Sequence, residues 1–302
     1  MTISAFSHLV FFVDPIKTLA FFAISMSLLS LWIRKTAWLW ASFAGISLIL
    51  AVSSHIIHPV ACIPLGLIFF LGWVLHLPIK GLLRLTVFGT LFVVAAALCF
   101  HFIPGFTNWK LASKMQLSPG GLPYDLWINY DKAFVGLLLL VWYTPLIQTI
   151  AGWKEVFYKS ALWILACVCI LLFLSQILKV VAWDPKLPSI FLPWLFINWI
   201  FVVIPEEALL RGVLLKELCG FFGGKPKGKI LALLVSTLIF TLFHLAWIAY
   251  LPFLLLVFVA GLSYGALYLW TGKIETSILC HGIVNTLHFL LFTYPALASI
   301  AT

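Results

Sequence analysis

The chain is a succession of long apolar runs separated by short polar turns. The runs are roughly 17 to 22 residues long, enough for a helix to cross ~30 Å of hydrocarbon. They do not alternate between apolar and polar positions as the strands of a membrane barrel do, so helices are the remaining way to satisfy the backbone in lipid. We count about ten predicted spans, at residues 17–33, 37–56, 60–77, 83–103, 133–150, 160–178, 189–204, 229–248, 251–270 and 275–294.

The composition agrees with this pattern. Hydrophobic residues make up 64% of the chain and charged residues 9%, and the mean hydropathy is +1.17. Soluble domains carry about 25% charged residues. We therefore predict an all-α, polytopic transmembrane helix bundle that is integral to the bilayer. Residues 1–13 lack a basic region and a small-residue cleavage site, so we expect no removable signal peptide there.

The net charge of +9 raises the question of nucleic-acid binding. Apart from Arg211, the 18 Lys and Arg residues are spread through short turns, and the excess of cations on one side of a membrane explains them better. Turns after alternate spans hold eleven cations: Arg34, Lys35, Lys80, Arg84, Lys154, Lys159, Lys216, Lys225, Lys227, Lys229 and Lys273. The other side holds six: Lys17, Lys110, Lys114, Lys132, Lys179 and Lys186. We expect no nucleic-acid partner, a location in the cytoplasmic membrane, and both termini outside the cytoplasm.

The longest polar interval is 104–132, where prolines and glycines alternate with tryptophans and tyrosines. Such a composition is typical of an interfacial loop. We expect it to separate an N-terminal accessory bundle, residues 1–132, from a C-terminal bundle, residues 133–302. Most unusual polar residues of the spans lie in 189–294, where we expect the functional core.

Two adjacent carboxylates, Glu206 and Glu207, are followed by Arg211 inside an apolar run, in a chain with only 9 acidic residues. Intramembrane acids cost several kcal/mol and usually serve chemistry or transport. Glu207 and Arg211 are four residues apart and can form an ion pair, while Glu206 is turned ~100° away and is predicted to be the free carboxylate. The alternative is a buried structural charge network without reactivity.

Two further helices carry candidate residues at a spacing of four. Phe240 and His244 share one face, as do His281 and Asn285. An imidazole beside a carboxamide can donate hydrogen bonds to an oxygen that becomes negative. The alternatives are a core histidine at 244 and interhelical hydrogen bonding at 281 and 285.

The predicted depths of the four candidate residues in the membrane agree. Glu206 and His244 lie ~20 and ~22 Å from the basic turn at 220–229, and His281 and Asn285 lie ~12 and ~18 Å from Lys273. All four are therefore predicted to face one cavity. Small residues at 261–266 would allow close helix packing around it.

The ordered motifs Glu-Glu-x-x-x-Arg (206–211), Phe-x-x-x-His (240–244) and His-x-x-x-Asn (281–285) resemble the signature of the CPBP family, the CAAX prenyl endopeptidases and bacteriocin-processing (Abi) intramembrane proteases. The resemblance implies a glutamic intramembrane protease in which Glu206 and His244 activate water. It implies that His281 and Asn285 support the oxyanion and that Glu207, Arg211 and Phe240 are structural. The implied partner is a membrane-associated protein or peptide substrate, with no cofactor.

Three other functions stay open at this point. Two imidazoles and a carboxylate are a plausible zinc ligand set, although the chain has no His-Glu-x-x-His helix. The same buried ionisable residues could relay protons or bind an ion in a transporter or channel. A catalytically idle immunity or scaffold protein is the third.

Overall fold

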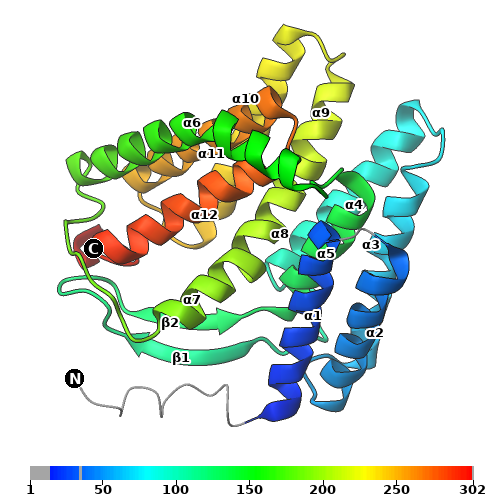
Figure 1. The fold of residues 1–302 in the computed structure, drawn as a ribbon, viewed down its shortest axis with the longest axis horizontal. Coiled ribbons are helices and arrows are strands. Elements are labelled where there is room, and N and C mark those ends of the chain that lie inside the picture. The colour runs from blue at the N-terminus through cyan, green and yellow to red at the C-terminus, as the bar shows by residue number, and fades with distance from the viewer. Residues whose placement is uncertain (1–13, 34–35, 301–302) are drawn as a thin grey trace. The chain divides into compact units, whose positions relative to one another are not determined.

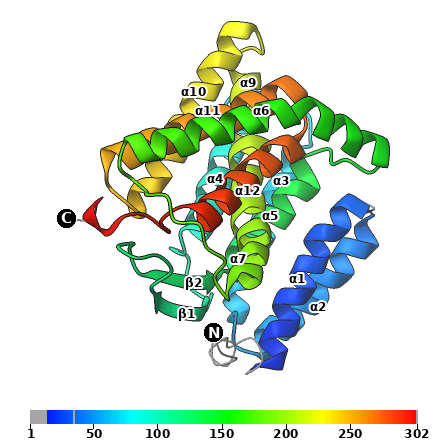
Figure 2. The same ribbon diagram turned by 60° about the vertical axis from the view of Figure 1, so that its left-hand side comes forward.

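The computed structural model describes residues 14–33 and 36–300. It confirms a helical polytopic bundle, with one small two-stranded sheet (Figures 1 and 2). The predicted absence of a signal peptide at 1–13 concerns residues outside the described ranges. In the described part of the chain, seven helices are long and apolar enough to cross a membrane: 15–33, 81–99, 150–177, 191–221, 226–246, 251–271 and 274–291. The total of about ten spans stays a prediction, because the helices at 37–53 and 59–74 are shorter.

The chain divides into two compact units, and each contains non-adjacent segments. Unit 1 consists of residues 1–112, 127–148 and 199–213, and unit 2 consists of residues 113–126, 149–198 and 214–302. The predicted division into domains 1–132 and 133–302 stays a prediction.

Unit 1 is built around helix α5 (Tyr130–Tyr143), most of whose side chains are buried. Four helices pack on it: α1 (Pro15–Ile33), α3 (Cys62–Val74), α4 (Gly81–Cys99) and the short α8 (Ile204–Glu207). Helix α2 (Ala37–Ser53) forms an antiparallel hairpin with α1, seen in blue in Figure 2. The predicted span 133–150 is too long, since α5 ends at Tyr143. Thr144 is extended because Pro145 follows it and disfavours the helical conformation.

Unit 2 is centred on three helices that pack on one another: α6 (Ile150–Ile177), α11 (Leu251–Thr271) and α12 (Ile274–Leu291). Helix α10 (Pro226–Phe243) packs on α11, and α9 (Lys216–Phe221) packs on α10 (Figure 1). Gly272 caps the end of helix α11, and its left-handed backbone (φ 67°) lets its N–H donate to the carbonyl of Tyr268. A glycine adopts this conformation without the penalty that a side chain would impose.

The predicted interfacial loop 104–132 contains the only strands of the described residues, β1 (Trp109–Met115) and β2 (Tyr124–Ile128). The sequence analysis predicted an interfacial loop here and did not identify the two strands. Aromatic and branched residues such as Trp109 and Ile128 favour strands, and the intervening Pro119-Gly120-Gly121 turns the chain.

The helical run from Phe191 to Phe221 departs from regular α-helix at two places. After α7 (Phe191–Ile197) comes a π-helical segment, Asn198–Val203, and after α8 comes a second one, Ala208–Leu215. The predicted span 189–204 is therefore too short. Because π-helical segments are uncommon and frequent at functional sites, the two that flank α8 mark Glu206 and Glu207 independently of their charge.

Candidate active site

Glu207 and Arg211 form the predicted ion pair. Arg211 Nη1 donates to Glu207 Oε1 at 2.9 Å, and the two side chains are 1% and 0% exposed. Breaking such a pair leaves an uncompensated buried charge, which is far more costly than the pair itself. A structural role for this pair is the simplest interpretation of its burial.

Glu206 is not the free carboxylate that the sequence analysis predicted. Its Oε1 atom lies 3.8 Å from the Nζ atom of Lys132, in the first turn of α5. The sequence analysis placed Lys132 among the loop cations, because nothing along the chain relates it to a residue 74 positions later. Glu206 is half-buried, and its side chain is 22% exposed.

His244 follows the last residue of α10 and is held by the preceding turn. Its Nδ1 atom lies 2.9 Å from the carbonyl oxygen of Phe240, and that oxygen can only accept a hydrogen bond. In neutral His244, Nδ1 therefore carries the proton and Nε2 carries the lone pair. This arrangement leaves Nε2 as the acceptor nitrogen of the imidazole.

The aromatic ring of Phe240 contacts both candidate histidines. Its centroid lies 4.5 Å from that of His244 and 6.2 Å from that of His281, with the rings close to perpendicular in each pair. Phe240 is 3% exposed. The structure thus brings Phe240, His244 and His281 together within unit 2 and gives Phe240 a packing role on both imidazoles.

His281 is also stacked on Tyr264, a residue that the sequence analysis did not identify. The two rings are 4.8 Å apart and nearly parallel, at 16°. Tyr264 lies three residues after Gly261, and a Cβ atom at Gly261 would approach a ring carbon of Phe240 to 2.9 Å. The predicted close packing at the small residues of α11 is confirmed at Gly261. Tyr264 lies on the same face of α11 as Gly261, and this spacing could have identified it from the sequence.

Asn285 is paired with Asn198, another residue that the sequence analysis missed. The Nδ2 atom of Asn285 donates to Asn198 Oδ1 at 3.2 Å. One turn away on each helix, Trp194 and Phe289 stack with ring centroids 4.0 Å apart. The two contacts run in opposite directions along α7 and α12, so together they define an antiparallel register between these helices.

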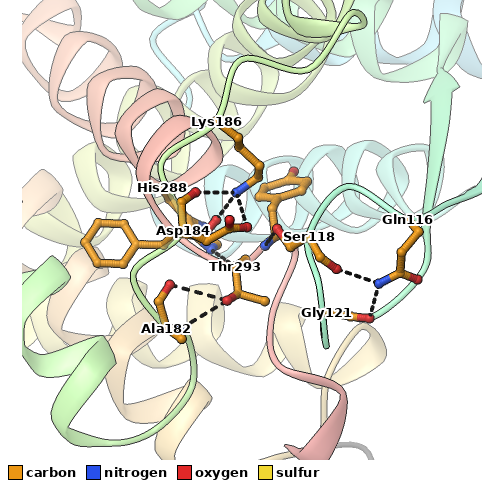
Figure 3. Close-up of polar contacts among 10 residues, drawn as sticks. Gln116, Ser118, Gly121, Ala182, Asp184, Lys186, His288 and Thr293 are labelled. Carbon is orange, nitrogen blue, oxygen red and sulfur yellow. Dashed lines mark hydrogen bonds and ion pairs between the residues drawn. The ribbon is translucent and has the colours of Figure 1, made fainter. Parts of the chain in front are cut away.

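A polar cluster lies just beyond the end of α12 (Figure 3). Lys186 Nζ lies 3.2 Å from Asp184 Oδ2 and also donates to the carbonyl of Phe292. His288, one turn after Asn285, donates from Nε2 to the carbonyl of Thr293. The Ser118 hydroxyl accepts a hydrogen bond from the backbone of Tyr294 at 2.9 Å. These contacts tie the loop before α7 and the hairpin turn to the end of α12.

Two titratable groups of this cluster have shifted pKa values. Burial raises the pKa of Asp184, but hydrogen bonds from Ser118 and Lys186 and the charge of Lys186 outweigh burial and lower it overall. Burial lowers the pKa of Lys186 more than the neighbouring Asp184 raises it. Asp184 and Lys186 lie in the loop between the spans 150–177 and 191–221, and their charges depend on pH.

The possible metal ligands are divided between the two units. Within either unit, no three His, Cys, Asp or Glu side chains of the described residues are grouped so that they could hold an ion. Glu206 is in unit 1 with Glu207 and Arg211, and the two histidines and Asn285 are in unit 2. The meeting of Glu206 with the imidazoles stays a prediction.

Comparison with known proteins identifies the segment that carries these residues. Residues 188–287 match the family described as Type II CAAX prenyl endopeptidase Rce1-like. No curated protein and no solved structure matches the chain. The matched segment contains every candidate residue predicted from the sequence, from Glu206 to Asn285. Residues 188–287 therefore form an Rce1-like domain, and this match agrees with the resemblance of the motifs to the CPBP (CAAX protease) family.

Proposed function

We propose that the protein is a glutamic intramembrane protease that hydrolyses a peptide bond near the C-terminus of a membrane-associated, prenylated protein. The observation that carries the proposal is the family match over 188–287, which spans all four proposed catalytic residues: Glu206, His244, His281 and Asn285. The seven membrane-capable helices support a substrate that reaches the enzyme from the bilayer. We place the enzyme in the cytoplasmic membrane, on the basis of its basic turns.

The first step is the activation of water by Glu206 and His244. A carboxylate takes one proton from the water molecule, and the oxygen of that water attacks the carbonyl carbon of the substrate. His244 supports this step through Nε2, which its bond to the Phe240 carbonyl leaves as the acceptor nitrogen. The proton stays on the enzyme, and the tetrahedral intermediate carries the negative charge on the former carbonyl oxygen.

The second requirement is stabilisation of that oxygen. His281 and Asn285 lie one turn apart on α12, and each offers N–H donors. The Asn285 amide has two N–H groups and uses one on Asn198, so the other can point to the oxyanion. Donors that are already oriented cost no reorganisation as the charge develops.

In the last step the C–N bond breaks and the proton taken from water is returned to the departing amine. The products are a free amine and a new carboxylic acid, which gives up its proton to water or to the amine after release, and the enzyme regains its initial protonation state. The proposed reaction therefore requires only the general base, the hydrogen-bond donors to the oxyanion and one water molecule.

The test uses purified full-length protein in lipid nanodiscs and a fluorescence-quenched peptide whose CAAX cysteine carries a prenyl group. We expect Glu206→Gln and His244→Ala to lower kcat by at least about a hundredfold, the usual effect of removing a general base. The matched control is Glu155→Gln, which removes an acid from an exposed pair with Lys159 on α6 and should leave cleavage unchanged. Cleavage at the wild-type rate by Glu206→Gln would contradict the proposed function.

A further inference from the structure

We propose that Lys132 is a positioning residue for Glu206, whose carboxylate it orients to accept a proton from water. This inference rests on the proposed function. Lys132 lies in α5, far outside the family-matched segment 188–287. Its Nζ atom is 3.8 Å from Glu206 Oε1, and the two side chains are 19% and 22% exposed.

The backbone packing of unit 1 produces this contact. Gly136 lies one turn after Lys132 on the same face of α5. A Cβ atom at Gly136 would come within 3.0 Å of Pro205 Cα and 3.1 Å of Pro205 Cγ. The glycine therefore lets α5 approach the residue just before Glu206. The lysine, one turn earlier on that face, then reaches the carboxylate.

The competing acid beside Lys132 already has partners. Asp131 is fully buried, and its Oδ2 atom lies 2.6 Å from His101 Nδ1. Its Oδ1 atom accepts the backbone N–H of Lys132 at 2.8 Å. The ammonium of Lys132 therefore pairs with Glu206, while the backbone N–H of Lys132 donates to Asp131.

The surroundings make a single cation effective. Cys99, at the end of α4, is 9% exposed, Asp131 is fully buried, and Lys132 and Glu206 are 19% and 22% exposed, so the contact lies in a largely buried part of unit 1. There a charge is screened less than in water, so the attraction between the Lys132 ammonium and the Glu206 carboxylate is stronger than it would be at the surface. Lys132 also restricts the rotamers of Glu206, which a neutral side chain would not do.

The experiment compares Lys132→Met and Lys132→Arg in the nanodisc assay with the prenylated CAAX peptide. We expect Lys132→Met to lower kcat about 10- to 100-fold with KM within about threefold, since misplacing a catalytic group costs rate rather than binding. Lys132→Arg keeps the charge and should restore kcat to within about threefold of wild type. Lys17→Met is the matched control, because Lys17 is a similarly exposed lysine of unit 1 that pairs with Asp14 instead. Its kcat should equal that of wild type.

A second measurement, thermal unfolding, does not depend on cleavage of the peptide. If the role of Lys132 is to compensate the charge of Glu206, Lys132→Met should lower the thermal unfolding temperature in the wild-type background and not in the Glu206→Gln background. This non-additivity is a direct measure of the coupling between the two side chains. It also applies where Lys132→Met is too unstable to assay for cleavage.

The outcomes separate this inference from the proposed function. Full activity of Glu206→Gln refutes the proposed function itself. An inactive Glu206→Gln together with Lys132→Met that behaves like Lys17→Met refutes only the role of Lys132. Equal losses in Lys132→Met and Lys132→Arg also refute it, because charge would then not be the operative property.

Discussion

Asn198 and Asn285 are joined by one side-chain hydrogen bond, in which Asn285 Nδ2 donates to Asn198 Oδ1 at 3.2 Å. Asn198 is the first residue of the π-helical segment that precedes Glu206, and Asn285 is the proposed oxyanion donor on α12. The bond fixes which end of the Asn285 amide is the donor. It therefore decides whether a second N–H is available to the substrate.

This bond predicts different effects for two substitutions at position 198. Asn198→Leu has a similar size but no acceptor, so the Asn285 amide can rotate. We expect kcat to fall about 10- to 100-fold, less than the ~10²- to 10³-fold typical of losing an oxyanion donor. Asn198→Asp keeps the acceptor and should retain more activity than Asn198→Leu. Equal kcat values for the two variants would show that the acceptor is irrelevant.

The buried pair of Glu207 and Arg211 predicts a stability effect. Arg211→Met leaves the Glu207 carboxylate buried without its cation, which we expect to cost about 3–5 kcal/mol of unfolding free energy. The double variant Glu207→Gln, Arg211→Met removes both charges and should recover most of this loss. Denaturant unfolding in detergent micelles gives both values. A double variant no more stable than Arg211→Met would argue against charge burial as the cause.

The polar cluster at Asp184 predicts a pH dependence of stability. Because the pKa of Asp184 is lowered in the folded protein, its ionised form stabilises the fold above the unfolded value of about 3.9. That contribution is lost as the pH falls through the lower folded pKa. At pH 7 we expect Asp184→Asn to be less stable than wild type by about 1 kcal/mol, the typical net value of a hydrogen bond.

The check is the unfolding temperature of wild type and Asp184→Asn between pH 7 and pH 3. The difference between the two proteins should shrink as the pH falls. Glu155→Gln is the control, because its exposed pair with Lys159 contributes little to stability. A difference that stays constant with pH would mean that the charge of Asp184 is not what stabilises the cluster.

Removal of metal ions tests the zinc hydrolase that the sequence left open. We expect the protein to keep full cleavage activity after dialysis against 1,10-phenanthroline, because the proposal assigns water activation to Glu206 and His244. The matched control is a known zinc protease treated in parallel. Activity lost on chelation and restored by added Zn²⁺ would replace the proposed mechanism with a metal-dependent one.

The sequence alone determined the membrane-helix class, since long apolar runs with few charges have no other stable arrangement in lipid. It also determined the Glu207–Arg211 pair, because a spacing of four within a helix brings side chains together whatever surrounds them. The family motifs within 206–285 are likewise a property of the chain read in order.

The tertiary structure decided the contacts between residues that are distant in the sequence. Lys132 meets Glu206 only because Gly136 allows α5 to pack on Pro205, and Asn198 meets Asn285 only in the register set by Trp194 and Phe289. The hydropathy pattern indicates which segments are apolar, but not which faces of two helices pack together. That choice depends on side-chain shape at close range, which is why the partners of the candidate residues became visible only in the folded protein.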